Sequence, residues 1–234
     1  MSIKTQDVAR DGLYGYLAQP DTAGKGAVLI VPTIFGVNAF VRGFAETLAR
    51  AGLTAAVCDL YSGQPLPANY EEALARARKL NDAMVDDIES RWLDHLQRGS
   101  ASLGGASLGL VGFCLGGRFV LIRAAQDQRI KTCAAAYPSI DNPMQPNQSQ
   151  DALKLAASIA CPVHICQPGI DHVASPETYR TLRDALLGRS AATVIQYYPE
   201  AEHGFMHRKE PAANPAATVI ALPQVVAFLV ACLN

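Results

Sequence analysis

The sequence predicts an α/β fold, in which a mostly parallel central sheet is flanked by helices on both faces. Short, continuous apolar runs such as residues 27–31 are typical of parallel strands that are buried on both sides. Between these runs lie segments with apolar residues at every third or fourth position, as in amphipathic helices. Because strands and helices alternate along the chain, right-handed crossovers would join the strands into one parallel sheet.

The N-terminal half is expected to begin with two short strands within residues 3–17, joined by a turn at residues 10–12. The elements predicted next are a strand at residues 27–31, a helix near 39–51 that ends at Gly52, a strand at 53–58 and a loop over 61–69. From about Glu71 to Leu96 the apolar periodicity continues, which predicts one long amphipathic helix.

The C-terminal half continues the alternation. The predicted strands are residues 108–111, 132–137, 162–167 and 192–198, with helices after the first of them and near 176–187, and a polar loop over 141–150. Residues 219–233 are the most apolar terminal stretch, but Pro223 and Gln224 favour an amphipathic closing helix over a membrane span. No repeat or linker interrupts the pattern, so we expect one domain over residues 1–234.

The composition is that of a globular protein with small-molecule partners. Of the 234 residues 50% are hydrophobic and 18% are charged, and 20 Lys and Arg balance 21 Asp and Glu. Such a chain has no net field that would attract nucleic acid or an anionic membrane. The six cysteines fit neither a disulfide scaffold nor a zinc pattern, and the first residues lack the apolar segment of a secretory signal. We therefore expect a cytoplasmic protein, with a monomer as the default.

The segment Gly112-Phe113-Cys114-Leu115-Gly116-Gly117 carries the strongest functional signal. It lies between a predicted strand and a predicted helix, where G-x-S-x-G would form the nucleophile elbow of an α/β-hydrolase, and Cys114 replaces the serine. Gly112 and Gly116 leave room for the close approach of strand and helix. The positive end of a helix dipole favours a thiolate, so Cys114 is the candidate nucleophile.

A histidine and a carboxylate in the order of this fold would complete a triad. His203 follows the last predicted strand and is the candidate base, with His207 in reserve, and Asp171 follows the preceding strand. His95 and His164 fall in a helix and a strand, and His172 adjoins Asp171. A core cysteine and a solvated histidine are the ordinary alternatives, but three residues in order at strand ends favour catalysis. A metal site at residues 202–207 is disfavoured by the loop setting and Gly204.

These segments resemble the dienelactone hydrolase (carboxymethylenebutenolidase) family of α/β-hydrolases along nearly the whole chain. The resemblance rests on the cysteine elbow and on Ile34-Phe35-Gly36-Val37-Asn38, Cys58-Asp59-Leu60-Tyr61, Asp171-His172 and His203-Gly204-Phe205. It implies the α/β-hydrolase fold, with Cys114 as nucleophile, His203 as base and Asp171 as its partner. The backbone N–H groups of Ile34 and Leu115 would form the oxyanion hole.

The resemblance also points to residues that would bind substrate. Members of this family carry a glutamate before the Ile34 loop that helps to deprotonate the thiol, whereas this chain has Thr33. Either His203 alone activates Cys114, or the thiol is engaged differently. The family uses arginines to hold a substrate carboxylate, which makes Arg76, Arg78 and Arg208 candidates. Thr33 and Phe35 are further candidates for substrate contact.

The sequence therefore predicts a hydrolase of a small ester or lactone that forms a thioester acyl-enzyme on Cys114. This chemistry requires no cofactor or metal. An acyltransferase or a thiol-dependent peptidase using the same thiol is one alternative, and product analysis with competing acceptors would identify it. The other is a non-catalytic or redox-sensing binding protein, for which a Cys114 pKa near that of free cysteine would be evidence.

Overall fold

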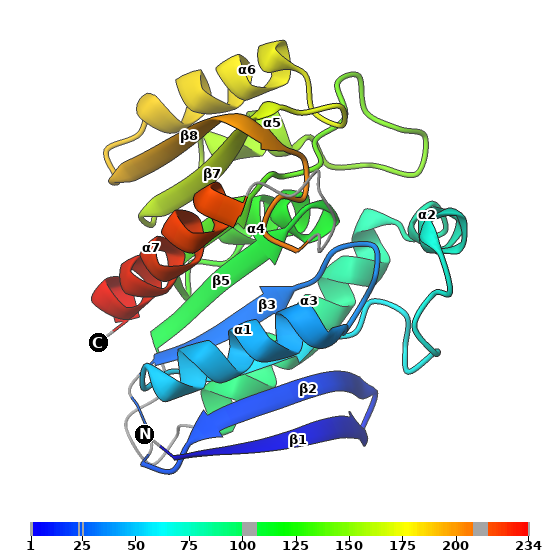
Figure 1. Ribbon diagram of the computed structural model, residues 1–234, viewed down its shortest axis with the longest axis vertical. Coiled ribbons are helices and arrows are strands. Elements are labelled where there is room, and N and C mark those ends of the chain that lie inside the picture. The colour runs from blue at the N-terminus through cyan, green and yellow to red at the C-terminus, as the bar shows by residue number, and fades with distance from the viewer. Residues whose placement is uncertain (1, 23, 25, 100–106, 208–214, 234) are drawn as a thin grey trace.

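A single mixed sheet of eight strands runs through the molecule (Figure 1). The computed structural model describes residues 2–22, 24, 26–99, 107–207 and 215–233. The strands are β1 (Ile3–Arg10), β2 (Leu13–Pro20), β3 (Gly26–Val31), β4 (Thr54–Cys58), β5 (Ser107–Phe113), β6 (Ile130–Ala136), β7 (Val163–Ile170) and β8 (Thr193–Glu202). Their order across the sheet is β1-β2-β4-β3-β5-β6-β7-β8. β2 pairs antiparallel with β1 and β4, and every other neighbouring pair is parallel, as the sequence predicts.

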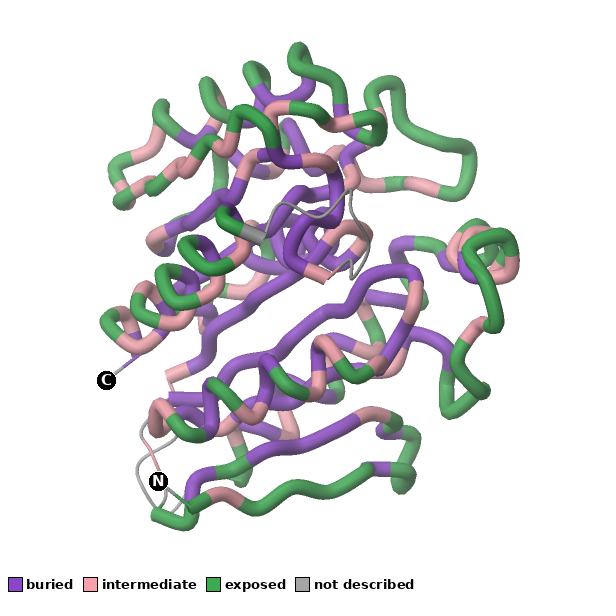
Figure 2. The backbone as a smooth tube through the Cα atoms, viewed as in Figure 1, coloured by how far each residue is buried: buried purple, intermediate pink, exposed green. Residues whose placement is uncertain are grey.

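Helices cover both faces of this sheet. They are α1 (Ala39–Arg50), α2 (Tyr70–Ala77), α3 (Asp82–Gly99), α4 (Leu115–Gln126), α5 (Ala152–Ala156), α6 (Pro176–Leu187) and α7 (Pro215–Leu233). α1 and α7 pack on one face, and α3, α4, α5 and α6 pack on the other, so that the core forms two apolar layers with the sheet between them. Figure 2 shows the central strands and the inner sides of these helices as buried. The fold is that of an α/β-hydrolase.

The prediction of one helix from Glu71 to Leu96 is wrong, because the chain forms α2 and α3 with a break between them. At the break the N–H groups of Lys79 and Leu80 bond the carbonyls three residues earlier, which tightens the last turn. Asn81 then accepts a hydrogen bond from the N–H of Met84 at 3.0 Å and starts a new helix. The apolar spacing spans the break, so periodicity alone does not reveal it.

Other boundaries also differ from the expectation. β8 continues to Glu202, beyond the predicted end at Tyr198, and α7 begins at Pro215 rather than at Val219. The short helix α5 lies after the polar loop, in a stretch for which no element was predicted.

α7 is apolar around most of its circumference. Its window Ala216–Leu233 has a mean hydropathy of 2.3, with 28% of the window buried, so by length and composition the helix could cross a membrane. A stripe with four-residue spacing is buried against the sheet, namely Ala217, Ala221, Val225, Leu229 and Leu233. Val219 and Ile220 are exposed. The buried stripe is the packing expected of the closing helix that the sequence predicts.

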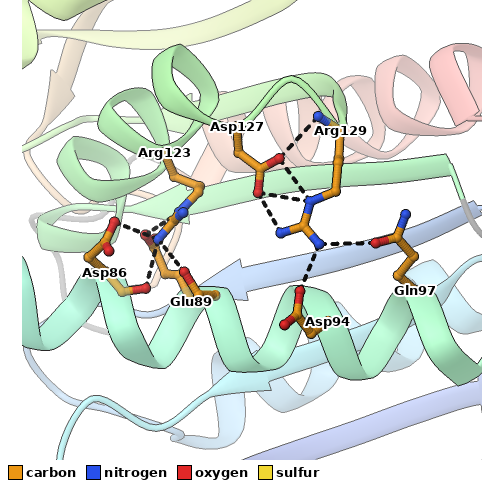
Figure 3. A network of polar contacts seen from close by, with 8 residues as sticks. Asp86, Glu89, Asp94, Gln97, Arg123, Asp127 and Arg129 are labelled. Carbon is orange, nitrogen blue, oxygen red and sulfur yellow. Dashed lines mark hydrogen bonds and ion pairs between the residues drawn. The ribbon is translucent and has the colours of Figure 1, made fainter.

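Two arginines connect α3 to α4 and to the turn between α4 and β6. In Figure 3, Arg123 reaches Asp86 at 2.6 Å and Glu89 at 3.4 Å. Arg129 donates to Asp94 and to Asp127, both at 2.7 Å. Since these charges connect elements that are far apart in sequence, they fix how α3 lies against α4.

One ion pair of this layer is fully buried. Arg118 on α4 donates to Asp82 at 2.6 and 3.1 Å, and each side chain is only 2% exposed. Asp82 also accepts from the N–H groups of Ser149 and Gln150, both at 2.7 Å. Burial raises the pKa of Asp82, but Arg118 and the two N–H groups outweigh it and lower the pKa. This pair therefore connects α3, α4 and the polar loop over residues 141–150.

Replacing Arg118 with methionine should lower the free energy of unfolding by about 3–5 kcal/mol, because Asp82 is left buried without its counter-charge. Urea denaturation measures the change. The matched control is Arg91→Met, which breaks the exposed pair with Asp87 and should cost about 1 kcal/mol or less. Equal costs for the two variants would contradict the structural role of the buried pair.

Candidate active site

Cys114 occupies a sharp turn between β5 and α4. Its backbone has φ 56° and ψ −116°, a conformation that residues other than glycine rarely adopt. A β-carbon on Gly112 would overlap the Gly116 carbonyl, and one on Gly116 would overlap the Val31 carbonyl at the end of β3. The two glycines therefore allow the close approach that the sequence predicts, and the turn places the sulfur at the N-terminus of α4.

Four neighbouring strands bring further residues to the same edge of the sheet. β3, β6, β7 and β8 are parallel to β5, so their carboxyl ends lie beside Cys114. The residues that follow them are Thr33 after β3, Ser139 after β6, Asp171 after β7 and His203 after β8. In α/β sheets this edge is where ligands bind.

A shift in register between β7 and β8 brings Asp171 opposite His203. At the start of the pair Val163 lies opposite Thr193, but at its end Ile170 lies opposite Glu202, so β8 contains two extra residues. The irregularity lies at Gly169, where a β-carbon would overlap the carbonyl of Pro199. Without the shift, Asp171 would lie opposite Ala201. With it, Nδ1 of His203 lies 3.0 Å from each carboxylate oxygen of Asp171.

Asp171 is held in place by more than the histidine. One oxygen accepts from the N–H groups of Val173 at 2.7 Å and Ala174 at 3.0 Å, and the other accepts from the hydroxyl of Tyr179 at 2.8 Å. Burial raises the pKa of Asp171, but the hydrogen bond and charge of His203, together with the two N–H groups, lower it. The carboxylate is thus ionised and fixes both the orientation and the tautomer of the imidazole.

Cys114 interacts with the other side of the His203 imidazole, and each of the two groups shifts the pKa of the other. Burial raises the pKa of the Cys114 thiol, but hydrogen bonds with His203 and Ser139 and the charge of His203 outweigh it and lower the pKa. Burial lowers the pKa of His203, but Asp171 and Cys114 raise it to about 9. Both shifts favour a thiolate beside an imidazolium at neutral pH.

Ser139 lies between the two members of this pair. Its Oγ is 3.2 Å from Sγ of Cys114 and 3.4 Å from Nε2 of His203. Sequence reasoning missed this residue, as it missed Tyr179. The only signal for Ser139 is its place just after a strand that ends at the same edge of the sheet as Cys114.

The backbone N–H groups of Ile34 and Leu115 are the candidate oxyanion donors, and both residues line the cavity in front of the sulfur. The Leu115 N–H is hydrogen-bonded to the Cys114 sulfur, which helps to lower the pKa of the thiol. Within the described ranges, neither N–H donates to a protein oxygen. The Ile34 loop is held by the hydroxyl of Tyr61, which donates to the Ile34 carbonyl at 2.9 Å. These positions suit the two donors of an oxyanion hole.

A cavity of about 900 Å³ opens at this edge. Its lining includes an aromatic cluster, with Phe35 6.4 Å from Tyr70 and 6.2 Å from His207 between ring centroids. Its polar lining includes Arg78 and residues of the loop after β6, namely Asp141, Gln145, Asn147 and Gln148. The break between α2 and α3 contributes to this polar lining, because Asn147 donates to the freed carbonyl of Leu80 at 2.8 Å.

The predicted substrate-binding residues lie in different places. Phe35, Arg78 and Thr33 line the cavity. Thr33 is buried, and its hydroxyl accepts the N–H of Phe35 at 3.2 Å, so it stabilises the turn around Ile34. The cavity lining does not include Arg76, whose guanidinium pairs with Glu72 and lies over the ring of Tyr61. Arg208 lies outside the described residues.

The described part of the chain contains no group of three or more His, Cys, Asp or Glu side chains placed to hold a metal ion. His207, the reserve base, is hydrogen-bonded through Nδ1 to the hydroxyl of Tyr137 at 3.2 Å. His172 is exposed, with its ring centroid 5.8 Å from that of His203.

Comparison with known proteins gives the same family that the motifs indicate. The model of the dienelactone hydrolase family matches residues 13–233. The chain belongs to this family. A carboxymethylenebutenolidase from Rhodococcus opacus is 29% identical over 197 residues, which cover 81% of this chain and 73% of that protein. A candidate carboxymethylenebutenolidase from Escherichia coli O157:H7 is 27% identical over 88% of this chain and 78% of its own.

The structural comparison agrees. The crystal structure of a candidate dienelactone hydrolase from Klebsiella pneumoniae superposes with a TM-score of 0.84 at 25% identity and covers 98% of this chain and 99% of its own. The dienelactone hydrolase fold thus accounts for nearly the whole chain, including the edge of the sheet at which Cys114, Asp171 and His203 meet.

The raised pKa of His203 can be measured directly. By NMR the ring of His203 should titrate near pH 9, because Asp171 and Cys114 stabilise its charged form. In Asp171→Asn the midpoint should fall by more than one pH unit. His164 is the internal control, since burial lowers its pKa and it is remote from Asp171 in the fold. A His203 midpoint that is the same in both proteins would contradict the assigned coupling.

Proposed function

We propose that this protein hydrolyses a small carboxylic ester or lactone through a Cys114-His203-Asp171 triad and a thioester acyl-enzyme. The observation that carries the proposal is the position of a strained, glycine-flanked cysteine beside an imidazole that is itself fixed by a buried carboxylate. All six cysteines lie in described ranges and are free, which fits a reducing compartment such as the cytoplasm.

In the first step the Cys114 thiolate attacks the carbonyl carbon, and the carbonyl electron pair moves onto oxygen. The N–H groups of Ile34 and Leu115 would stabilise this oxyanion. The leaving alkoxide departs as the C–O bond breaks, and it takes the proton from Nε2 of His203. The products of this half-reaction are an alcohol and the thioester on Sγ; from a lactone, the alcohol stays on the acyl chain.

In the second step water replaces the alcohol. His203 is now neutral and removes a proton from water as the oxygen attacks the thioester. Collapse of the tetrahedral intermediate releases the carboxylic acid and regenerates the thiolate, with the proton back on His203. Throughout, Asp171 stabilises the charged imidazole without taking its proton.

The cavity suggests where the substrate would lie. Phe35 and Tyr70 contribute aromatic surface to the cavity, and Arg78 contributes a positive charge. Among the described residues no ion pair includes Arg78, so it is the candidate for holding an acidic group of the substrate. Arg76 is less suited, because Glu72 already neutralises it.

Cys114→Ala should lower kcat/KM for p-nitrophenyl acetate at least about a thousand-fold, because it removes the thiol that would form the acyl-enzyme. Cys232→Ala, which removes a half-buried thiol on α7, is the control and should leave the rate unchanged. Wild-type activity in Cys114→Ala would end the proposal. Preferential transfer of the acetyl group to an added alcohol would replace hydrolysis with the acyltransferase alternative.

Arg78→Gln should raise KM for the mono-p-nitrophenyl ester of succinic acid about five-fold, the effect of losing one partly exposed ion pair. The neutral p-nitrophenyl butyrate should be affected less than two-fold. Arg183→Gln, an exposed arginine on α6, serves as the charge-matched control. An equal change for both esters would exclude a role for Arg78 in binding a carboxylate.

A further inference from the structure

Ser139 is the polar side chain that contacts both ends of the catalytic pair. Its hydroxyl oxygen lies 3.2 Å from Sγ of Cys114 and 3.4 Å from Nε2 of His203. A hydroxyl has one proton to donate and two lone pairs to accept with. It can therefore donate to a thiolate while it accepts the N–H of an imidazolium. With a neutral thiol and a neutral imidazole it would instead donate to Nε2 and accept the S–H, which is a weak donor. The charged pair therefore has the stronger hydrogen bonds to this hydroxyl.

The backbone holds Ser139 in this place. Its N–H donates to the Cys114 carbonyl at 2.9 Å, and the Cys114 N–H donates to the Ala136 carbonyl at 3.0 Å, so the loop after β6 is fastened to the elbow. Tyr137 has a φ of 38°, in the left-handed region that residues other than glycine rarely adopt. Such local strain persists only where the surrounding structure imposes it.

Tyr137 also packs against His203 and helps to position its imidazole. The ring of Tyr137 is fully buried and lies 5.4 Å from the ring of His203, at an interplanar angle of 66°. The same turn thus places an aromatic ring against the imidazole and, two residues later, a hydroxyl beside its Nε2. The backbone that carries this hydroxyl is therefore fixed by the fold.

We infer that Ser139 is a catalytic residue of this protein, which stabilises the thiolate of Cys114 and the imidazolium of His203 as the resting ion pair. The inference rests on the proposed function of Cys114. In forming the pair, the S–H bond breaks and its proton moves to Nε2. The Ser139 hydroxyl then donates to the negative sulfur and accepts from Nε2–H, and no other atom changes its protonation. Thr33, at the position where the family has a glutamate, has its hydroxyl engaged with the N–H of Phe35.

Four other titratable groups near the thiol are hydrogen-bonded to residues other than Ser139. Asp141 accepts from Gln145 at 3.2 Å and from Gln148 at 2.7 Å, and His207 is bonded to Tyr137. Tyr61 bonds the Ile34 carbonyl, and Tyr179 bonds Asp171. Tyr70, Arg78 and His172 line the cavity. All of these groups are retained when Ser139 alone is changed, so a variant at this position isolates the hydroxyl.

The test is the pH dependence of alkylation of Cys114 by iodoacetamide, followed by mass spectrometry of the modified peptide in a Cys232→Ala background. Only the thiolate reacts, so the rate reports its population. In Ser139→Ala the pH at which the alkylation rate is half-maximal should rise by about one unit. At pH values below the wild-type midpoint, the rate should therefore be about ten-fold lower than in the wild type. Above pH 9 the two rates should agree within about two-fold. Ser139→Thr, which keeps a hydroxyl, should restore most of the wild-type profile.

Ser190→Ala, an exposed serine after α6, is the matched control and should give the wild-type profile. A profile for Ser139→Ala that coincides with wild type overturns the inference, and so does a uniform loss of rate at every pH, since that indicates a displaced backbone. Alkylation needs no substrate. A shifted limb in a protein that hydrolyses no ester would therefore retain the role of Ser139 and reject the proposed hydrolysis.

Discussion

The tight passage of the chain from β5 into α4 is the constraint on which the rest of the site depends. Gly116 lies against the end of β3, and Gly112 lies against Gly116, so that no larger residue fits at either position. At this turn Cys114 has a positive φ and lies at the N-terminus of α4. The same few contacts therefore place the candidate nucleophile and both candidate oxyanion donors at one edge of the sheet.

Electrostatics at this edge depend on burial. The side chains of His203 and Asp171 are 5% and 3% exposed, so water screens their interaction little, and each charge strongly shifts the pKa of its neighbour. Burial alone would favour neutral forms of Cys114, His203 and Asp171. The chain of hydrogen bonds reverses this preference and favours a charged Cys114 at the cavity. Ser139 extends that chain from the imidazole back to the sulfur.

The wall of the cavity depends on a buried ion pair some distance from the chemistry. Asp82 begins α3, pairs with Arg118 on α4 and holds the backbone of Ser149 and Gln150. The loop over residues 141–150 is thereby fixed between α4 and the break that separates α2 from α3. This explains why the amphipathic pattern from Glu71 to Leu96 predicted the wrong structure. Apolar spacing reports which face is buried, whereas the break is set by Asn81, Asp82 and the loop that bonds to them.

The sequence by itself determined the α/β class, the strands of the sheet and the order in which cysteine, aspartate and histidine follow strand ends. These are local properties, because apolar runs, caps and the glycines around Cys114 are legible along the chain. Only the tertiary structure decided how the ends of neighbouring strands meet. The two extra residues of β8 set Asp171 opposite His203, and the strained turn at Tyr137 set Ser139 between histidine and thiol. Register and side-chain contact arise from pairing between distant segments, and no local pattern encodes them.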